Sequence, residues 1–475
     1  MARYYGSIDI GTTRIKARLY DEEFNLSYSR DLENRTYTMP GGVAEQDPLF
    51  IVDSVRSLLS DLLARGAASI GVATYRGSLI VWDGEGSPVT NIITWMDTRS
   101  RRLYKSLPLN VRLAARLPRI GNALSPESMA VRLAILVRER SDVARGLNAG
   151  SLYAWNIDAY IAFKIIGRYS SDAGNAALTG LIHPKTLKPI KPILNLIGLR
   201  KMRLPEILCH DEVIGYLKGA SFGPSMGDQQ ASSIALGCID EGCLRISLGT
   251  GLFLGYTTGE RLYLKSGYIP LIVYCSRHRR VYGLELYVPG LGRMVEWLVN
   301  TTLGGDYRLF NENVKNDYRG PIIVPFIWGL RRPRIKELSS GIIGIDGIHS
   351  ASDLVNSLAH SIAAITTLLF KELTRIGKPK RIIITGGLAR MDNLVKLIAS
   401  YIERPVQVSR RADDSAIGAA LAAANSVGFN PSYRPDTYTI EPDPSVSRVD
   451  PELIVDTARL IEGLIWRSMA KRSHY

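Results

Sequence analysis

Two short turns of glycine and threonine are the first residues of the sequence whose types and spacing suggest chemistry. The segment "DIGTTRIKARLYD" carries Gly11-Thr12-Thr13, and the segment "SLGTGLFLG" carries Gly249-Thr250-Gly251. Each turn separates two stretches with the alternating pattern of β-strands. A glycine-rich turn lets backbone N–H groups converge on one anion, and threonine adds a hydroxyl donor. Two such turns in one chain predict a protein that binds a polyphosphate.

An aspartate stands two residues before the first of these turns. The carboxylate of Asp9 would repel phosphate unless a cation lay between them, so we expect Asp9 to hold Mg²⁺. The chain has no G-x-x-x-x-G-K-[ST] motif, which excludes a P-loop protein, and "GTGLFLG" lacks the spacing of a dinucleotide-binding turn.

Two further segments combine a glycine with a polar side chain. Asp228, in "MGDQQASS", opens a helix of small residues, where it can cap the helix or accept a proton from a substrate hydroxyl during phosphoryl transfer. In "ITGGLARMDN", Gly386 and Gly387 leave a flat surface against which a purine can lie, with Asn393 at its edge. Close packing of strand on helix is the alternative reading of the second segment.

The elements that must position these residues follow from hydrophobic periodicity. The spacing predicts a hairpin over 7–21, a helix over 49–64, and two strands joined by a turn at Arg76-Gly77. The pattern of strand, Gly-Thr turn and strand recurs after about half of the chain, so we predict two similar halves. Further helices are expected over 128–140, 153–166, 294–303, 353–377 and 451–470.

The length of 475 residues predicts more than one domain. We expect domains at 1–237 and 238–430, followed by a proline-rich strap and a helix at 431–475. No long apolar run and no signal peptide are evident, which favours the cytoplasm and no membrane partner. The net charge of +14 is dispersed, so a nucleic-acid partner is not favoured. The four cysteines form no C-x-x-C pair and are expected to be buried or partly buried thiols. The chain has only four glutamines, which is typical of a thermophile.

Six segments, in this order, resemble the motifs of the FGGY carbohydrate kinases. They are "DIGTTRIKARLYD", "GGVAEQDP", "IITWMDTRS", "GDQQA", "SLGTG" and "TGGLARMDN" with "DDSAIGAALAA". The pair "GDQQ" and "GTGLF" is most similar to the glycerol kinase branch. The resemblance implies an α/β protein with two similar actin/hexokinase-like (ribonuclease H-like) domains around a central cleft. It also implies ATP-dependent phosphorylation of a small polyol or sugar, with ATP and Mg²⁺ as cofactors. Whether the protein forms a homodimer is left open.

The resemblance also implies roles for individual residues. Asp228 would be the catalytic base, and Asp9 would hold the metal. The residues expected at the nucleotide are Gly11, Thr12, Thr13, Lys16, Gly249, Thr250, Gly251, Gly292, Gly386, Gly387 and Asn393. The residues expected at the polyol are Arg76, Gly77, Trp95, Asp228, Gln229 and Phe253.

The sequence departs from glycerol kinase at two positions of the expected polyol site. Gly77 stands where that branch has glutamate, and Ala123 stands where it has an aromatic residue. Two hydroxyl partners are lost and space is gained, which favours a longer polyol or a ketose over glycerol. Xylulokinases have a Met-His pair in place of residues 75–77, and that pair is absent. A catalytically inactive sugar sensor on the same fold is the alternative function.

Overall fold

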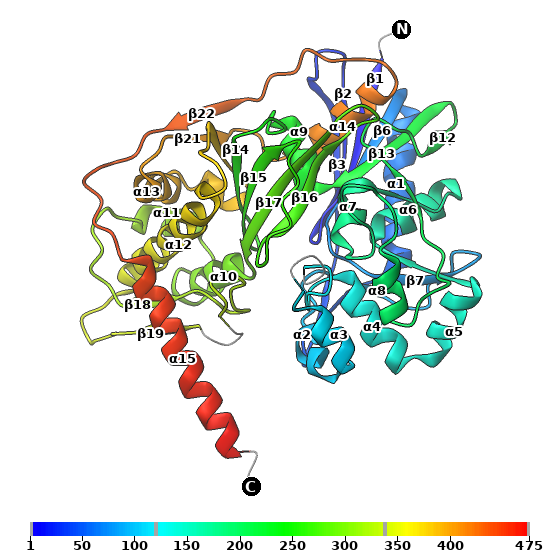
Figure 1. Ribbon diagram of the computed structural model, residues 1–475. Helices are drawn as coiled ribbons and strands as arrows, with labels where there is room; N and C mark the ends of the chain where they lie inside the picture. Colours follow the sequence, from blue (N-terminus) through cyan, green and yellow to red (C-terminus); the bar gives the residue numbers. More distant parts are fainter. Residues whose placement is uncertain (1–2, 118–121, 336–339, 473–475) are drawn as a thin grey trace. The chain divides into compact units, whose positions relative to one another are not determined.

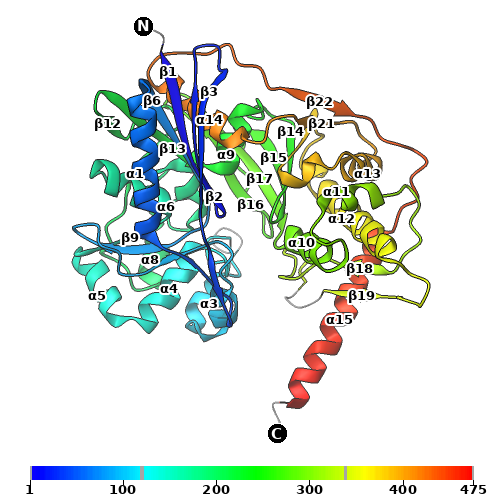
Figure 2. The same cartoon turned by 180° about the vertical axis from the view of Figure 1, so that it is seen from behind.

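The computed structural model describes residues 3–117, 122–335 and 340–472, which form two compact α/β units (Figures 1 and 2). Each unit is assembled from three separate stretches of chain. The first contains Met1–Ile239, Gly259–Gly283 and Asp413–Pro435, and the second contains Asp240–Thr258, Leu284–Ala412 and Asp436–Tyr475. The expected fold class of two similar sheet-containing domains is confirmed. The domain boundaries expected at 237 and 430 stay predictions.

The first unit is built on a sheet in which β12, β13, β6, β1, β2 and β3 are neighbours in that order. β1 (Tyr4–Ile10) and β2 (Arg14–Tyr20) form the expected antiparallel hairpin. β1 also runs parallel to β6 (Ala67–Thr74), which runs parallel to β13 (Ala220–Gly227). The carboxyl ends of these three strands therefore meet at one edge of the sheet. The outer strands are β3 (Leu26–Glu33) and β12 (Gly215–Leu217).

Helices α1 (Pro48–Ala64) and α14 (Asp414–Ser426) cover opposite faces of this sheet. Alternate residues of a strand point to opposite faces. Ile70 and Val72 of β6 join the large apolar core on the α1 side. On the other side Ser69 Oγ donates to the carbonyl of Ala423 in α14 at 2.8 Å. At Gly71 a Cβ would lie 2.0 Å from the carbonyl oxygen of Ala419, so only glycine lets α14 approach this closely.

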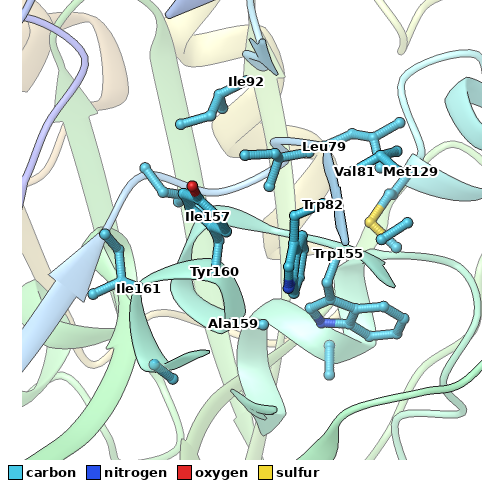
Figure 3. Close-up of a cluster of buried hydrophobic side chains, with 14 of the residues drawn as sticks. Leu79, Val81, Trp82, Ile92, Met129, Trp155, Ile157, Ala159, Tyr160 and Ile161 are labelled. Atoms are coloured by element: carbon cyan, nitrogen blue, oxygen red, sulfur yellow. The ribbon is translucent and has the colours of Figure 1, made fainter. Parts of the chain in front are cut away.

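A second layer of the first unit surrounds a cluster of large buried side chains (Figure 3). Trp82 of β7 (Ile80–Asp83) and Tyr160 of α6 (Ile157–Ile166) meet edge to face, with ring centroids 5.3 Å apart. The helix predicted over 153–166 is wrong at its start, because Leu152–Trp155 forms strand β9, which pairs with β7. Other elements of this unit are β4 (Tyr37–Met39), β5 (Val43–Gln46), β8 (Ile92–Ile93), α2 (Arg99–Leu103), α3 (Leu109–Ala114), α4 (Met129–Glu139), α5 (Ser141–Ala149), β10 (Ser170–Asp172), α7 (Ala173–Leu178), α8 (Lys191–Leu196), β11 (Glu206–Leu208), α9 (Asp228–Ala235) and β16 (Ile269–Cys275).

The second unit repeats the plan of the first. β14 (Cys243–Leu248) and β15 (Leu252–Gly259) form an antiparallel hairpin, and β14 runs parallel to β20 (Arg381–Thr385). This is the relation of β1, β2 and β6, so the predicted internal duplication agrees with the fold. The other elements here are the part of β17 (Arg280–Val288) from Leu284 onward, α10 (Leu291–Thr302), α11 (Tyr307–Asn313), β18 (Ile322–Val324), β19 (Gly341–Ile343), α12 (Ala351–Thr374), a 3₁₀ turn at Gly387–Arg390, α13 (Asp392–Ile402), β21 (Val406–Ser409), β22 (Thr437–Ile440) and α15 (Pro451–Arg472).

Two parts of the second unit bear on the sequence expectations. The proline-rich strap was expected to lack regular structure, but Thr437–Ile440 pairs with β21 as β22. Among the described residues one helix, α12, is long and apolar enough to cross a membrane. Because 83% of its most apolar window is buried inside the protein, it is typical of a core helix.

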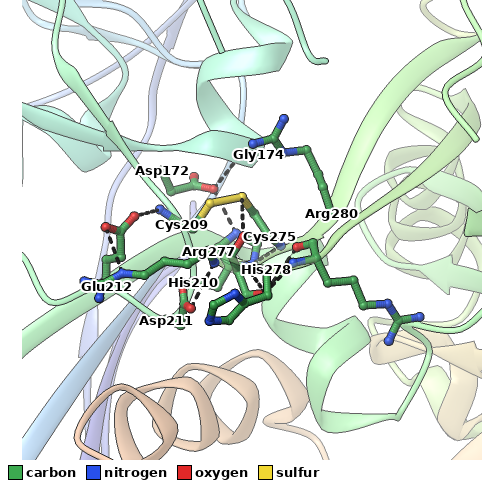
Figure 4. The surroundings of a disulfide bond; sticks show 12 residues. Asp172, Gly174, Cys209, His210, Asp211, Glu212, Cys275, Arg277, His278 and Arg280 are labelled. Carbon is green, nitrogen blue, oxygen red and sulfur yellow. Dashed lines mark hydrogen bonds and ion pairs between the residues drawn. A yellow bond between two sulfur atoms is a disulfide. The ribbon is translucent and has the colours of Figure 1, made fainter. Parts of the chain in front are cut away.

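The expectation of buried thiols is wrong, because Cys209 and Cys275 form a disulfide (Figure 4). The described residues include no free cysteine. Beside the disulfide, His210 Nδ1 accepts from the backbone N–H of Cys275 at 3.3 Å. Its Nε2 therefore carries the proton and donates to Asp172 at 3.1 Å. The disulfide closes a loop of 66 residues and ties the end of β16 to the loop after β11.

Candidate active site

The first Gly-Thr turn is held by hydrogen bonds to all three of its carbonyl oxygens. Asn34 Nδ2 donates to the carbonyl of Gly11 at 2.7 Å, and the backbone N–H of Asn34 donates to that of Thr13 at 2.9 Å. Gln46 Nε2 donates to the carbonyl of Thr12 at 2.9 Å. In a trans peptide the N–H points opposite to the C=O. The N–H groups of Thr12 and Thr13 therefore point away from these donors, as an anion-binding turn requires.

Asp9 lies in β1 directly before this turn, and its environment suits a cation. The side chain is 5% exposed, and its Oδ2 accepts a hydrogen bond from Ser415 Oγ at 2.7 Å. Burial raises the pKa of Asp9, although Lys16 and Ser415 act in the opposite direction. A cation beside the carboxylate would offset that cost of burial, so the residues present fit Mg²⁺.

Lys16 lies opposite Asp9 on β2, but its ammonium is shared with a second carboxylate. Lys16 Nζ is 2.8 Å from Asp413 Oδ1 and 4.0 Å from Asp9 Oδ2. Arg18 also pairs with Asp413, at 2.8 Å. Burial alone would raise the pKa of Asp413, but the hydrogen bonds from Lys16 and Arg18 lower it below its usual value. A phosphate contact by Lys16 stays a prediction, and it would compete with this pair.

The carboxyl ends of β1, β6 and β13 bring the first Gly-Thr turn, Arg76 and Asp228 into one row along the edge of the sheet. Ile10 pairs with Thr74, and Thr74 pairs with Gly227, so these last strand residues lie side by side. The turn at Gly11, the loop carrying Arg76 and the first residue of α9, Asp228, continue from that row. Arg76 Nε lies 3.8 Å from Asp228 Oδ1.

Asp228 is the first helical residue of α9, and Gly227 holds the N-cap position without a side-chain hydrogen bond. The capping role left open for Asp228 is therefore not realised. Its Oδ1 accepts a hydrogen bond from the backbone N–H of Gln229 at 2.7 Å. Next to it, Gln229 Oε1 is buried and meets no donor among the described residues. A buried acceptor of this kind is a place for a hydroxyl of a bound molecule.

Trp95 and Gly77 belong to two loops that touch. Gly77 has a φ of +70°, and a Cβ added there would lie 3.4 Å from Trp95 Cβ. The Trp95 loop is anchored by Asp97, whose Oδ2 accepts from the backbone N–H of Ala44 at 3.0 Å. Because φ at position 77 is +70°, a glutamate in place of Gly77 would have to adopt the left-handed backbone conformation that favours glycine.

Gln46 joins the two halves of this site, and the motif "GGVAEQDP" contains it without revealing its role. Its Nε2 holds the carbonyl of Thr12, and its Oε1 accepts from the hydroxyl of Tyr75 at 2.6 Å. Burial raises the pKa of Tyr75, which keeps the hydroxyl protonated as a donor. The phosphate turn and the loop of Arg76 are thereby connected through one fully buried amide.

In the second unit the structure brings three of the expected glycine positions together. The N–H of Gly292 at the start of α10 donates to the carbonyl of Thr250 at 3.1 Å. A Cβ at Gly292 would lie 2.1 Å from the carbonyl oxygen of Gly249, and one at Gly386 would lie 2.4 Å from that of Leu248. An added Cβ would meet nothing within 4 Å at Gly249 or Gly387, whereas Gly292 and Gly386 pack directly against the backbone of the second hairpin. The nucleotide contacts of these residues stay a prediction.

Two expected binding residues of the second unit have partners within the protein. The ring of Phe253 stacks on Tyr287, with centroids 5.5 Å apart. Asn393 Nδ2 donates to the carbonyl of Asn311 at 2.8 Å, and the backbone N–H of Asn393 donates to the side chain of Asn311. Both roles stay predictions.

The family models decide the class of protein. The model for the N-terminal domain of the FGGY family of carbohydrate kinases matches residues 4–239, and the C-terminal model matches residues 244–427. The chain belongs to this family. This FGGY kinase is 26% identical to the glycerol kinase of Chloroflexus aggregans, over 90% of this chain and 91% of that protein. It is 27% identical to an uncharacterised sugar kinase of Archaeoglobus fulgidus, over 89% and 92%.

Solved structures share the fold of this FGGY kinase. The glycerol kinase of Plasmodium falciparum with ADP has a TM-score of 0.82 at 23% identity, covering 99% of this chain and 98% of that one. The ligand-bound xylulose kinase of Lactobacillus acidophilus has a TM-score of 0.79 at 21% identity, covering 98% of each chain. The fold is thus common to kinases named for different substrates.

Proposed function

We propose that this FGGY kinase transfers the γ-phosphoryl group of ATP to a hydroxyl of a four- or five-carbon polyol or ketose, with Asp228 as the base. The observation that carries the proposal is the row at the edge of the first sheet. It holds an anion-binding turn, the guanidinium of Arg76 and the carboxylate of Asp228 on three neighbouring parallel strands. Phosphoryl transfer depends mainly on positioning and on charge, which such a row supplies.

The chemistry assigned to each side chain follows from its surroundings. Asp228 accepts the proton of the attacking hydroxyl, and the guanidinium of Arg76, 3.8 Å from Asp228 Oδ1, orients that carboxylate. Gln229 Oε1 accepts a second hydroxyl and so fixes the acceptor. The N–H groups of Thr12 and Thr13 bind the transferred phosphate.

The acceptor is proposed to be longer than glycerol. Gly77 offers no carboxylate to a hydroxyl, and its φ of +70° suits glycine. Ala123 leaves further room. A missing hydrogen bond costs about 0.5–1.5 kcal/mol, or roughly tenfold in specificity. Glycerol, with three hydroxyls and no further carbon, would leave part of such a site unused.

The proposed reaction uses Mg²⁺, which Asp9 would help to hold. When bound with ATP, the ion would neutralise part of the phosphate charge. Asp9 would supply one carboxylate to it, and Ser415 Oγ would hold that carboxylate in place.

We also propose that the enzyme is cytoplasmic and comes from a thermophile. ATP is an intracellular substrate, yet disulfides are rare in most cytoplasmic proteins. Intracellular proteins of hyperthermophiles are the exception, and the disulfide of Cys209 and Cys275 joins the low glutamine count in support.

A screen of ATP consumption tests the function. The purified enzyme is given Mg²⁺, ATP and, in turn, glycerol, longer polyols, ketopentoses and aldoses, and kcat/KM is compared. We expect a four- or five-carbon polyol or ketose to exceed glycerol. Glycerol turnover at least as efficient as that of every longer acceptor would overturn the substrate assignment, and no ATP consumption with any acceptor would overturn the proposed function.

A further inference from the structure

Arg132 is a buried arginine that no sequence motif singled out. It lies in α4, and the residue is only 5% exposed. Its Nη1 donates a short hydrogen bond to the carbonyl oxygen of Gly77. Its Nη2 donates to the carbonyl of Trp95 at 3.3 Å and lies 3.5 Å from that of Asp97. One guanidinium therefore contacts the backbone of two separate loops.

A guanidinium suits this task better than other cations. The group is planar and presents its N–H donors in a fixed fork, so acceptors bound to it keep a set separation. Burying the charge is costly unless its donors are used, and the carbonyl oxygens supply the negative ends of peptide dipoles. Arg132 thus fixes the distance between the Gly77 turn and the Trp95 loop.

Both loops carry residues of the proposed polyol site. Gly77 directly follows Arg76, whose Nε is 3.8 Å from Asp228. Trp95 is itself a proposed polyol contact. A displacement of either loop would change where Arg76 and Trp95 meet the acceptor, and a shift of about 1 Å at a reacting centre can cost roughly a hundredfold in rate.

The helix that carries Arg132 is held rigidly. Ser128 caps α4 through its side chain, which accepts from the N–H of Val131 at 3.2 Å. Met129 of α4 packs in the same buried cluster as Leu79, two residues beyond Gly77 (Figure 3). The guanidinium therefore acts from a fixed base.

We propose that Arg132 is a positioning residue that shapes the polyol site by holding the backbone of Gly77 and Trp95. The inference rests on the proposed function, and it deepens it by naming what sets the geometry of the acceptor pocket. Arg132 acts through the two loops and is not a catalytic residue.

Arg132→Lys tests the inference, because it keeps the charge and replaces the fork with one compact ammonium. With the best acceptor from the screen, we expect kcat/KM for the acceptor to fall about 10- to 100-fold, mainly through KM. KM for ATP should stay at the wild-type value. Arg138→Lys is the matched control, since Arg138 is exposed on the last turn of the same helix and should leave both KM values unchanged.

Comparing KM for the acceptor with KM for ATP separates a loss of loop positioning from a loss of folded protein. A variant that merely folds less well contains fewer active molecules, which lowers the apparent kcat and leaves both KM values unchanged. Arg132→Gln, which retains one amide donor, serves as a second variant if Arg132→Lys does not fold.

The outcomes distinguish the two proposals. An active wild type together with a wild-type acceptor KM in the folded Arg132 variant overturns the role of Arg132 alone. A wild type that consumes ATP with no acceptor overturns the proposed function, and this inference falls with it.

Discussion

Two aspartates of the first unit differ in what surrounds them, and the difference separates the proposed base from a buried structural group. Asp228 is about one-third exposed at the start of α9, near Arg76. Asp158 is 1% exposed in α6, where its Oδ2 accepts from Ser171 Oγ at 2.6 Å and from the N–H of Asp172 at 3.1 Å. The first can reach a bound molecule, and the second can reach only protein.

Asp228→Asn removes the proposed base while keeping nearly the same shape. We expect kcat to fall by about 10²–10⁴, the range for losing general-base catalysis, with an unchanged circular dichroism spectrum and unchanged ATP binding. Steady-state kinetics and calorimetry check this. Turnover close to that of the wild type would remove Asp228 from the mechanism.

Asp158→Asn should change how stability depends on pH. Burial, and then repulsion from Asp172, raises the pKa of Asp158 to about 7. The folded state therefore keeps a proton that the unfolded state has lost, so stability is highest below about pH 4 and declines as the pH rises to about 7. At about 1.4 kcal/mol per pKa unit, this loss is on the order of 4 kcal/mol.

Urea unfolding at several pH values between 4 and 8 measures that slope. The Asp158→Asn variant should lose the decline. Asp142→Asn is the control, because the neighbouring Arg140 lowers the pKa of Asp142 to about 2, outside the window. A wild-type slope in Asp158→Asn would contradict the assignment.

At the scale of single residues, the sequence predicted those site residues that belong to recognisable motifs. Asp9 could be singled out because it stands two residues before a glycine-rich turn, and Asp228 because it follows a glycine and opens a helix of small residues. Arg132 and Gln46 could not, because both act on carbonyl oxygens of other segments, and backbone acceptors leave no trace in residue type. Such contacts depend on tertiary structure alone.

At the scale of elements, the two hairpins are stabilised by different means. The first relies on side chains, Asn34 and Gln46, that bind its carbonyls. The second relies on the close approach of Gly292 and Gly386. Hairpins of the same shape therefore have different sensitivities to mutation.

Asn34→Ala tests the first hairpin. The variant removes the donor to the carbonyl of Gly11, so the turn should loosen and KM for ATP should rise about tenfold, with little change in KM for the acceptor. Asn25→Ala, at an exposed position between β2 and β3, is the matched control. An unchanged KM for ATP in Asn34→Ala would show that this hydrogen bond does not shape the phosphate site.

The periodicity of the sequence predicted both hairpins and the longer helices α1, α4, α10, α12 and α15, but it did not predict short helices such as α2, α3 and α8. It failed at Leu152–Trp155, where the helical pattern of α6 was extended too far. The segment is a strand because it pairs with β7 and buries Trp155 in the apolar cluster. Short apolar runs of this kind are decided by their partners rather than by their own pattern.

At the scale of the whole molecule, the disulfide joins segments that are remote in sequence. Cys209 and Cys275 are separated by 66 residues, yet their Cα atoms are 5.0 Å apart. Four cysteines without a recognisable spacing gave no basis for a pairing, because proximity across such a distance arises only in the fold. Through β16 the disulfide also supports α9, since Gln230 Nε2 donates to the carbonyl of Ile272 at 3.2 Å.

Replacing both Cys209 and Cys275 by alanine should destabilise the protein. In the chain-entropy model a loop of this size corresponds to about 4 kcal/mol. Urea unfolding of the double variant and the wild type, both without reductant, measures the difference. Equal midpoints and equal slopes would mean that the disulfide adds nothing to stability.

The position of α14 has a consequence for how the chain is made. β13 ends at Gly227, but the helix that covers the other face of its sheet is complete only at Ser426. At about 5–20 residues per second, a ribosome needs roughly 10–40 s to synthesise the intervening chain. During that interval the nascent sheet exposes Ser69, Gly71 and Ala73 on this face, together with the larger apolar residues Tyr5, Tyr20 and Met226, which share apolar clusters with α14 in the folded protein. This apolar surface stays open to other nascent chains until α14 is synthesised, so the late position of α14 in the chain prolongs the period in which the nascent protein is prone to aggregate.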